Sequence, residues 1–127
     1  ASVLAWNPDY VLLDEPTLGQ DFKFKEKLRR ILTDLHSCGK TIILVSHDIE
    51  FVADLNCKVT VMANGKILCQ GPASEVLSDE KIVSEGKLDF PQLTRAFKNL
   101  DMFSSQRIFS VEQAKNIISE KIKAKKR

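Results

Sequence analysis

The fold of this chain is decided by the stretch Tyr10-Val11-Leu12-Leu13-Asp14-Glu15-Pro16. Its apolar residues follow one another without a polar interruption, a pattern typical of a strand buried on both faces in a parallel sheet. Two carboxylates come next, and Pro16 lacks the N–H that would continue a sheet ladder. The stretch therefore predicts a buried strand that ends in an acidic turn.

A helix and a second strand of the same kind follow. Asp21 is a favourable N-cap for a helix with one apolar stripe, and Gly39 provides its left-handed end. The run Thr41-Ile42-Ile43-Leu44-Val45 then leads into Ser46-His47-Asp48. Because a right-handed crossover returns the chain to the same edge of the sheet, we expect the two strand ends to share one crevice.

A hairpin and further helices complete the expected organisation. Residues 1–6 are interpreted as the end of a helix that Asn7-Pro8 stops. Strands at 59–62 and 66–69 flank Asn64-Gly65, a strong hairpin signal. Helix signals dominate beyond about Asp79, and a final helix should pack one apolar face against protein. That face carries Val111, Ala114, Ile118 and Ile122.

Composition narrows the class of protein. The chain has 127 residues, of which 43% are hydrophobic and 28% charged, as in a globular domain. A formal net charge of +2 is too small to create the strong positive field that attracts nucleic acid, so we expect no nucleic-acid partner. No apolar run approaches the roughly 20 residues of a membrane-spanning helix. The cysteines, odd in number and without C-x-x-C spacing, favour reduced thiols over a disulfide framework or a zinc site.

Three residues at the two strand ends have side chains suited to phosphoryl chemistry. Asp14 is a hard oxygen ligand of the kind that Mg²⁺ prefers. Glu15 leaves the strand where it can face a water that attacks a phosphoryl group. His47 can donate to a γ-phosphate oxygen. The structural alternative is an acidic surface turn beside a hydrogen-bonded turn histidine.

These segments resemble the motifs of ATP-binding-cassette (ABC) ATPases. Residues 10–17 are similar to the Walker B strand, 18–21 to the D-loop, and 46–48 to the switch-histidine loop. The resemblance covers roughly residues 1–78, with the motifs in the family's order and spacing. It implies an α/β fold: part of a P-loop NTPase parallel sheet with flanking helices and a β-hairpin, followed by a helical C-terminal extension at 79–127.

The resemblance also implies a role for individual residues. Asp14 would hold Mg²⁺ through water, Glu15 would act as the general base, and His47 would contact the γ-phosphate, with ATP and Mg²⁺ as cofactors. Asp21 would signal across an ATPase dimer, a role compatible with capping a helix. The residues on either side of Gly19 depart from the commonest D-loop pattern, which leaves those inter-subunit contacts open.

Two other family motifs do not occur in the sequence. Gly39-Lys40-Thr41 is no phosphate-binding loop, because Asp34 stands at the first glycine position and a strand follows instead of a helix. The L-S-G-G-Q signature precedes residues like 1–5 in the family. We therefore interpret the chain as the C-terminal half of an ATPase domain and expect it to be inactive alone.

The missing half would also include a strand. In the family, the strand that leads into Walker A lies between the segments that correspond to 41–45 and 59–62. The unpaired backbone groups at the edge of an apolar strand tend to hydrogen-bond to a strand of another chain. We therefore expect these two segments to pair directly, or another copy of the chain to cover the gap.

Three segments, 3–8, 46–53 and 88–94, resemble energy-coupling-factor importers. In that group, ATPase subunits power the uptake of vitamins or of cobalt and nickel ions. The resemblance implies a second ABC ATPase subunit and transmembrane transporter subunits as partners. It places the protein in the cytoplasm, peripheral on the inner face of the cell membrane. A helical appendix that only packs on the domain is the alternative for the tail.

Other functions stay open at this point. A soluble ABC ATPase of DNA maintenance shares the same motifs, but such proteins usually insert long heptad coiled coils, and the sequence has no such repeat. An ABC protein that acts on ribosomes fits the short hairpin and helical tail less well than a transporter subunit does. A non-catalytic dimerisation or regulatory module is the remaining alternative.

Overall fold

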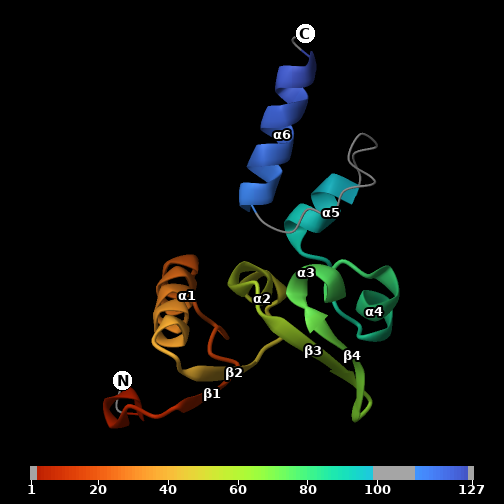
Figure 1. The fold of residues 1–127 in the computed structure, drawn as a ribbon. Coiled ribbons are helices and arrows are strands. Elements are labelled where there is room, and N and C mark those ends of the chain that lie inside the picture. Colours follow the sequence, from red (N-terminus) through yellow and green to blue (C-terminus); the bar gives the residue numbers. More distant parts are fainter. Residues whose placement is uncertain (1–2, 99–110, 126–127) are drawn as a thin grey trace. The chain divides into compact units, whose positions relative to one another are not determined.

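The structure is a computed structural model that describes residues 3–98 and 111–125 (Figure 1). Its contacts divide the chain into two compact units, Ala1–Phe51 and Val52–Arg127. The first unit holds η1 (Val3–Trp6), β1 (Tyr10–Asp14), α1 (Phe22–Ser37), β2 (Thr41–Val45) and the start of α2 (Ile49–Leu55). The predicted α/β order of strand, helix, strand and helix is confirmed.

In the first unit, β1 and β2 form a parallel two-stranded sheet whose register runs from Tyr10↔Thr41 to Asp14↔Val45. Helix α1 begins after Asp21 and packs against β2. Gly39 follows the helix with a φ of 84°, the left-handed conformation expected of its end.

The expectation that both strands are buried on both faces is wrong. Val11 is 6% exposed, but Leu12 on the opposite face of β1 is 70% exposed. The register sets Leu12 beside Ile43, which is 52% exposed. Because α1 covers one face only, side chains that alternate along these strands are alternately covered and exposed.

The expected helix end at residues 1–6 is also corrected. Residues Val3–Trp6 form a 3-10 helix instead of the last turns of an α-helix. Asn7 then takes a φ of 48°. Pro8 disfavours the right-handed α conformation in the residue before it, so the helical turn ends before Asn7.

After the end of α2, the second unit contains the predicted hairpin. Strands β3 (Lys58–Ala63) and β4 (Lys66–Pro72) pair antiparallel. The turn residues Asn64 and Gly65 have φ values of 51° and 73°, as the primed hairpin turn requires.

Short helices follow the hairpin, as expected for this part of the chain. They are α3 (Ala73–Val76) and α4 (Glu80–Glu85), and α3 contacts both strands. Val76 and Leu77 are 2% and 1% exposed. The second unit therefore has a closed apolar core around α3.

The tail contains α5 (Gln92–Lys98) and α6 (Val111–Lys125), which confirms its helical character. Phe97 and Ala114 are buried together, with Leu93 and Ile117 packed against them. The predicted apolar face is wrong beyond Ala114: Ile118 and Ile122 are 39% and 54% exposed, and the side chain of Val111 lies outside the described residues. The physical reason is the shortness of α5, which meets only the first turns of α6.

Of the two outcomes expected for the gap, direct pairing between β2 and β3 is not observed, and cover by another copy of the chain stays a prediction. Among the described strands, β2 pairs with β1 alone and β3 with β4 alone. The segment between them, 46–57, is occupied by α2 and its turns. It lies at the lower limit of the dozen or so residues that a parallel crossover needs.

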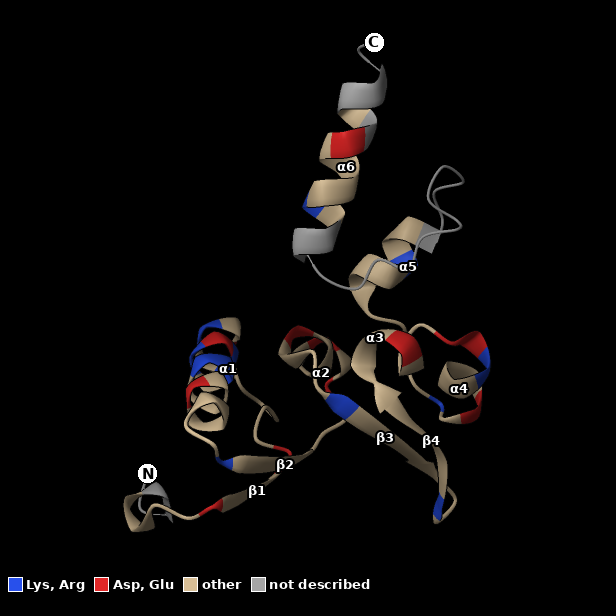
Figure 2. Cartoon of the chain, in the orientation of Figure 1, with Lys and Arg blue, Asp and Glu red and all other residues tan. Residues whose placement is uncertain are grey.

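Charged residues are frequent along α1 (Figure 2). There Glu26 bridges Arg29 at 2.6 Å and Arg30 at 3.3 Å on the solvent side. Within the described residues, no helix is both long enough and apolar enough to cross a membrane.

Candidate active site

The candidate site lies where β1 and β2 end side by side. The register pairs Asp14 with Val45, and the N–H of Glu15 donates to the Val45 carbonyl at 2.9 Å. This hydrogen bond extends the ladder by one residue and sets Glu15 against the loop after β2. The prediction that these two strand ends meet at one edge is confirmed.

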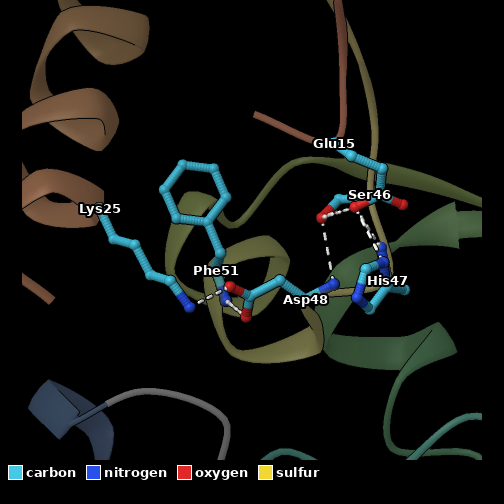
Figure 3. A network of polar contacts seen from close by, with 6 residues as sticks. All are labelled: Glu15, Lys25, Ser46, His47, Asp48 and Phe51. Carbon is cyan, nitrogen blue, oxygen red and sulfur yellow. Dashed lines mark hydrogen bonds and ion pairs between the residues drawn. The ribbon is translucent and has the colours of Figure 1, made fainter. Parts of the chain in front are cut away.

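Glu15 and His47 are in direct contact (Figure 3). The Nδ1–H of His47 donates to Oε2 of Glu15 at 2.9 Å. The backbone N–H of His47 and the hydroxyl of Ser46 reach the same oxygen at 3.4 and 3.5 Å. Because all three hydrogen bonds end on Oε2, Oε1 is the carboxylate oxygen left to face a further group.

This arrangement fixes the charge of Glu15. The hydrogen bond from the His47 side chain lowers the pKa of Glu15 below its usual range, against the opposing effect of partial desolvation. Glu15 is therefore a carboxylate at neutral pH. A ring proton on Nδ1 leaves Nε2 of His47, whose side chain is 71% exposed, to face another group.

The backbone at Glu15 is held in an uncommon conformation. Its φ is 44°, in the left-handed region that residues with a Cβ rarely occupy. The following turn is closed by the N–H of Leu18, which donates to the Glu15 carbonyl at 3.2 Å. Strained backbone of this kind persists only where surrounding contacts hold it in place, and it is frequent at functional sites.

Asp14 is the last residue of β1, and its side chain is exposed. Among the described residues, no group of three or more histidine, cysteine, aspartate or glutamate side chains could enclose a metal ion. A single exposed carboxylate nevertheless fits Mg²⁺, which keeps several waters and takes its other ligands from substrate phosphates. Asp14 is therefore compatible with the water-mediated ligand role expected of it.

Asp21 is placed as the N-cap of α1. Its Oδ1 accepts the N–H of Phe24 at 2.7 Å, with the extended backbone conformation that a cap requires. Capping of this helix, expected from the sequence, is confirmed. The inter-subunit role of Asp21 stays a prediction.

Two further residues near the site, Asp48 and Lys25, were not predicted from the sequence to have a role. The carboxylate of Asp48 binds the ammonium of Lys25 on α1 at 2.5 Å and accepts the N–H of Phe51 at 3.1 Å. An aspartate directly before the helix at 49–55 is a capping signal and could have revealed the second contact. The contact with Lys25 spans 23 positions, and nothing local in the sequence indicates it.

Comparisons with known proteins show which proteins this chain resembles. The chain is 40% identical to the energy-coupling factor transporter ATP-binding protein EcfA2 of Clostridium tetani over 119 residues, 91% of this chain and 41% of that protein. It is 37% identical to EcfA2 of Clostridium perfringens, covering 97% of this chain and 45% of that protein. No known family profile matches the chain.

A solved structure shares the fold. It is cbiO1 from Clostridium perfringens, which is part of the ABC transporter complex cbiONQ. The similarity has a TM-score of 0.56 at 30% identity and covers 76% of this chain and 39% of that one. The chain therefore has part of the ABC ATPase fold and is homologous to ABC transporter ATP-binding proteins.

The relatives narrow this class further. They are named energy-coupling factor transporter ATP-binding proteins in both clostridia and in Methanocaldococcus jannaschii, whose protein is 38% identical over 80% of this chain. This chain is thus a homologue of the energy-coupling factor ATPases. It spans less than half the length of these relatives.

Proposed function

We propose that this chain supplies the carboxylate and histidine part of the ATPase site in an ABC importer of the energy-coupling factor type. The observation that carries the proposal is the 2.9 Å contact between Glu15 and His47 at the shared end of two parallel strands. Ligands of open α/β sheets bind at this edge. The left-handed backbone of Glu15 supports the proposal, because such strain is frequent at functional sites.

In this proposal each residue at the strand ends has a separate task. Glu15 accepts the proton of an attacking water through Oε1, the oxygen that His47 does not occupy. His47 faces the γ-phosphate through Nε2. Asp14 would hold Mg²⁺ through water, and the ion would supply positive charge that neutralises phosphate. Asp21 caps α1 and signals to a second ATPase subunit.

The wider setting is proposed on the same basis. Residues 1–78 would form the ABC portion and residues 79–127 an extension shared with the energy-coupling factor group, since the clostridial alignments cover nearly the whole chain. The partners would be a second ATPase subunit and transmembrane subunits at the inner face of the cell membrane. The substrate class would be vitamins or metal ions.

The test is ATP hydrolysis by a chimera in which this chain replaces the matching segment of the Clostridium tetani relative. Glu15→Gln should bind ATP as the parent chimera does and lose turnover by about 10²- to 10⁴-fold, because an amide cannot accept the proton. The matched control is Glu26→Gln on α1, which should turn over normally. The 127-residue chain alone should show no turnover. Near-parental rates for Glu15→Gln would refute the proposal.

A further inference from the structure

Asp48 joins segments from four parts of the first unit. Its carboxylate binds the Lys25 ammonium of α1 at 2.5 Å and the N–H of Phe51 in α2 at 3.1 Å. The hydroxyl of Thr17, a residue only 3% exposed in the turn after β1, also hydrogen-bonds it. Its own backbone N–H donates to the Ser46 hydroxyl at 3.0 Å. Figure 3 shows the contacts of Asp48 with Lys25, Phe51 and Ser46 beside Glu15 and His47.

The ion pair is the strongest link in this junction. Burial alone would raise the pKa of Asp48, but the Lys25 ammonium and the hydrogen bonds from Phe51 and Thr17 outweigh it and hold the pKa below its usual range. The Asp48 side chain is 16% exposed and that of Lys25 34%. Contacts to a charge that is partly withdrawn from water are stronger than exposed surface pairs.

The junction reaches the candidate catalytic pair through Ser46. The Ser46 hydroxyl accepts the N–H of Asp48, which orients its own proton toward Oε2 of Glu15 at 3.5 Å. His47 lies between these two anchored residues in the sequence. Fixing Ser46 and Asp48 therefore fixes the backbone from which the His47 ring meets Glu15.

The other end of the link lies in the first turn of α1. The backbone N–H of Lys25 donates to the carbonyl of Asp21, the cap of the helix, at 3.1 Å. Lys25 thus connects the start of α1, which follows the segment similar to a D-loop, with the loop that carries His47. Its ammonium touches neither Glu15 nor His47, so it acts on them only through Asp48.

We propose that Lys25 is a positioning residue that, by binding Asp48, holds the loop 46–48 so that His47 meets Glu15. The inference rests on the proposed function for its effect on turnover. Its structural part, the coupling of Lys25 to the His47 ring, stands independently of any ATPase activity. The two parts therefore need separate measurements.

The structural part is tested by NMR on the 127-residue chain, through the ring nitrogen signals of His47. The parent chain should give one ring conformation with the proton on Nδ1. Lys25→Met should shift or broaden these signals, whereas Lys25→Arg should restore them. The matched control is Lys27→Met, an exposed lysine of the same helix. Unchanged His47 signals in Lys25→Met would overturn the inference.

The functional part is tested in the chimera, by separating kcat from KM for ATP. Lys25→Met should lower kcat roughly 10- to 100-fold with KM unchanged, as expected when reacting groups are misplaced and substrate binding is retained. Lys25→Arg should recover most of kcat, and Lys27→Met should behave as the parent. A kcat of Lys25→Met equal to that of Lys27→Met would overturn the inference.

A second variant covers the case in which Lys25→Met folds poorly. Asp48→Asn keeps an oxygen to accept the Phe51 N–H but removes the charge that binds Lys25. Its kcat should fall as in Lys25→Met, and the double variant should add no further loss, because both changes break one link. Fully additive losses would overturn the inference. Parental turnover of Glu15→Gln would instead refute the proposed function and leave the NMR result to decide the coupling.

Discussion

The two units of this chain differ in what their residues do. The first unit carries the candidate site, yet it exposes Tyr10, Leu12, Ile43 and Val45 along one face of its sheet. The second unit has no residue assigned to chemistry, yet it buries Val76 and Leu77 almost completely. The unit that bears the chemistry is thus the one with the less complete core.

This difference follows from how each sheet is covered. A hairpin strand pairs with its neighbour in the sequence, and α3 packs on it directly afterwards, so the second unit closes its core from local segments. Parallel strands need cover on both faces, and in the first unit α1 covers one. One face of the first unit's sheet is therefore left without an apolar cover.

The largest expected effect comes from the core of the second unit. Leu77→Ala should lower the free energy of unfolding by about 2–5 kcal/mol, because it leaves a cavity in a closed core. Leu12→Ala, at a position that is 70% exposed, should change it by no more than about 0.5 kcal/mol. Urea unfolding of the two variants measures both values. Equal losses would show that the contrast between the units is wrong.

A smaller effect is expected at the start of α1. Asp21→Ala removes the cap on the Phe24 N–H and should cost about 0.5–2 kcal/mol of stability. Asp34→Ala, near the other end of the same helix, should cost nothing or stabilise slightly, because it removes a negative charge from the negative end of the helix dipole. Thermal unfolding measures the stability of both variants. An Asp21→Ala variant as stable as the parent would show that the cap does not stabilise α1.

The smallest effect is the dependence of stability on pH through Asp48. Its pKa lies below the ordinary 3.8 in the folded chain, so ionised Asp48 contributes stability above the unfolded pKa. That contribution should disappear as the pH falls through the lower folded pKa. The difference in unfolding free energy between the parent and Asp48→Asn should therefore shrink below about pH 4. A difference that is constant with pH would contradict the ion pair.

The sequence predicted the elements of both units well, because the relevant signals are local. The apolar run at 10–13, the cap Asp21 and the pair Asn64-Gly65 each specify their own backbone. The crossover rule was enough to bring Glu15 and His47 to one edge.

What the sequence could not provide depends on contacts between distant segments. Exposure of Leu12 and Ile43 follows from which faces of the sheet are covered, and residue patterns do not specify that. The pairing of Lys25 with Asp48 depends on how α1 lies against the loop after β2. The left-handed backbone of Glu15 is set by its turn and by contacts with His47.

The central claim is that the candidate site lies on the unit with the less complete apolar core. Amide hydrogen exchange on the 127-residue chain, resolved by residue, tests this claim most directly. The amides paired between β3 and β4 and those of α3 should exchange most slowly, and the amides paired between β1 and β2 markedly faster. Equal or greater protection of β1 and β2 would contradict the account.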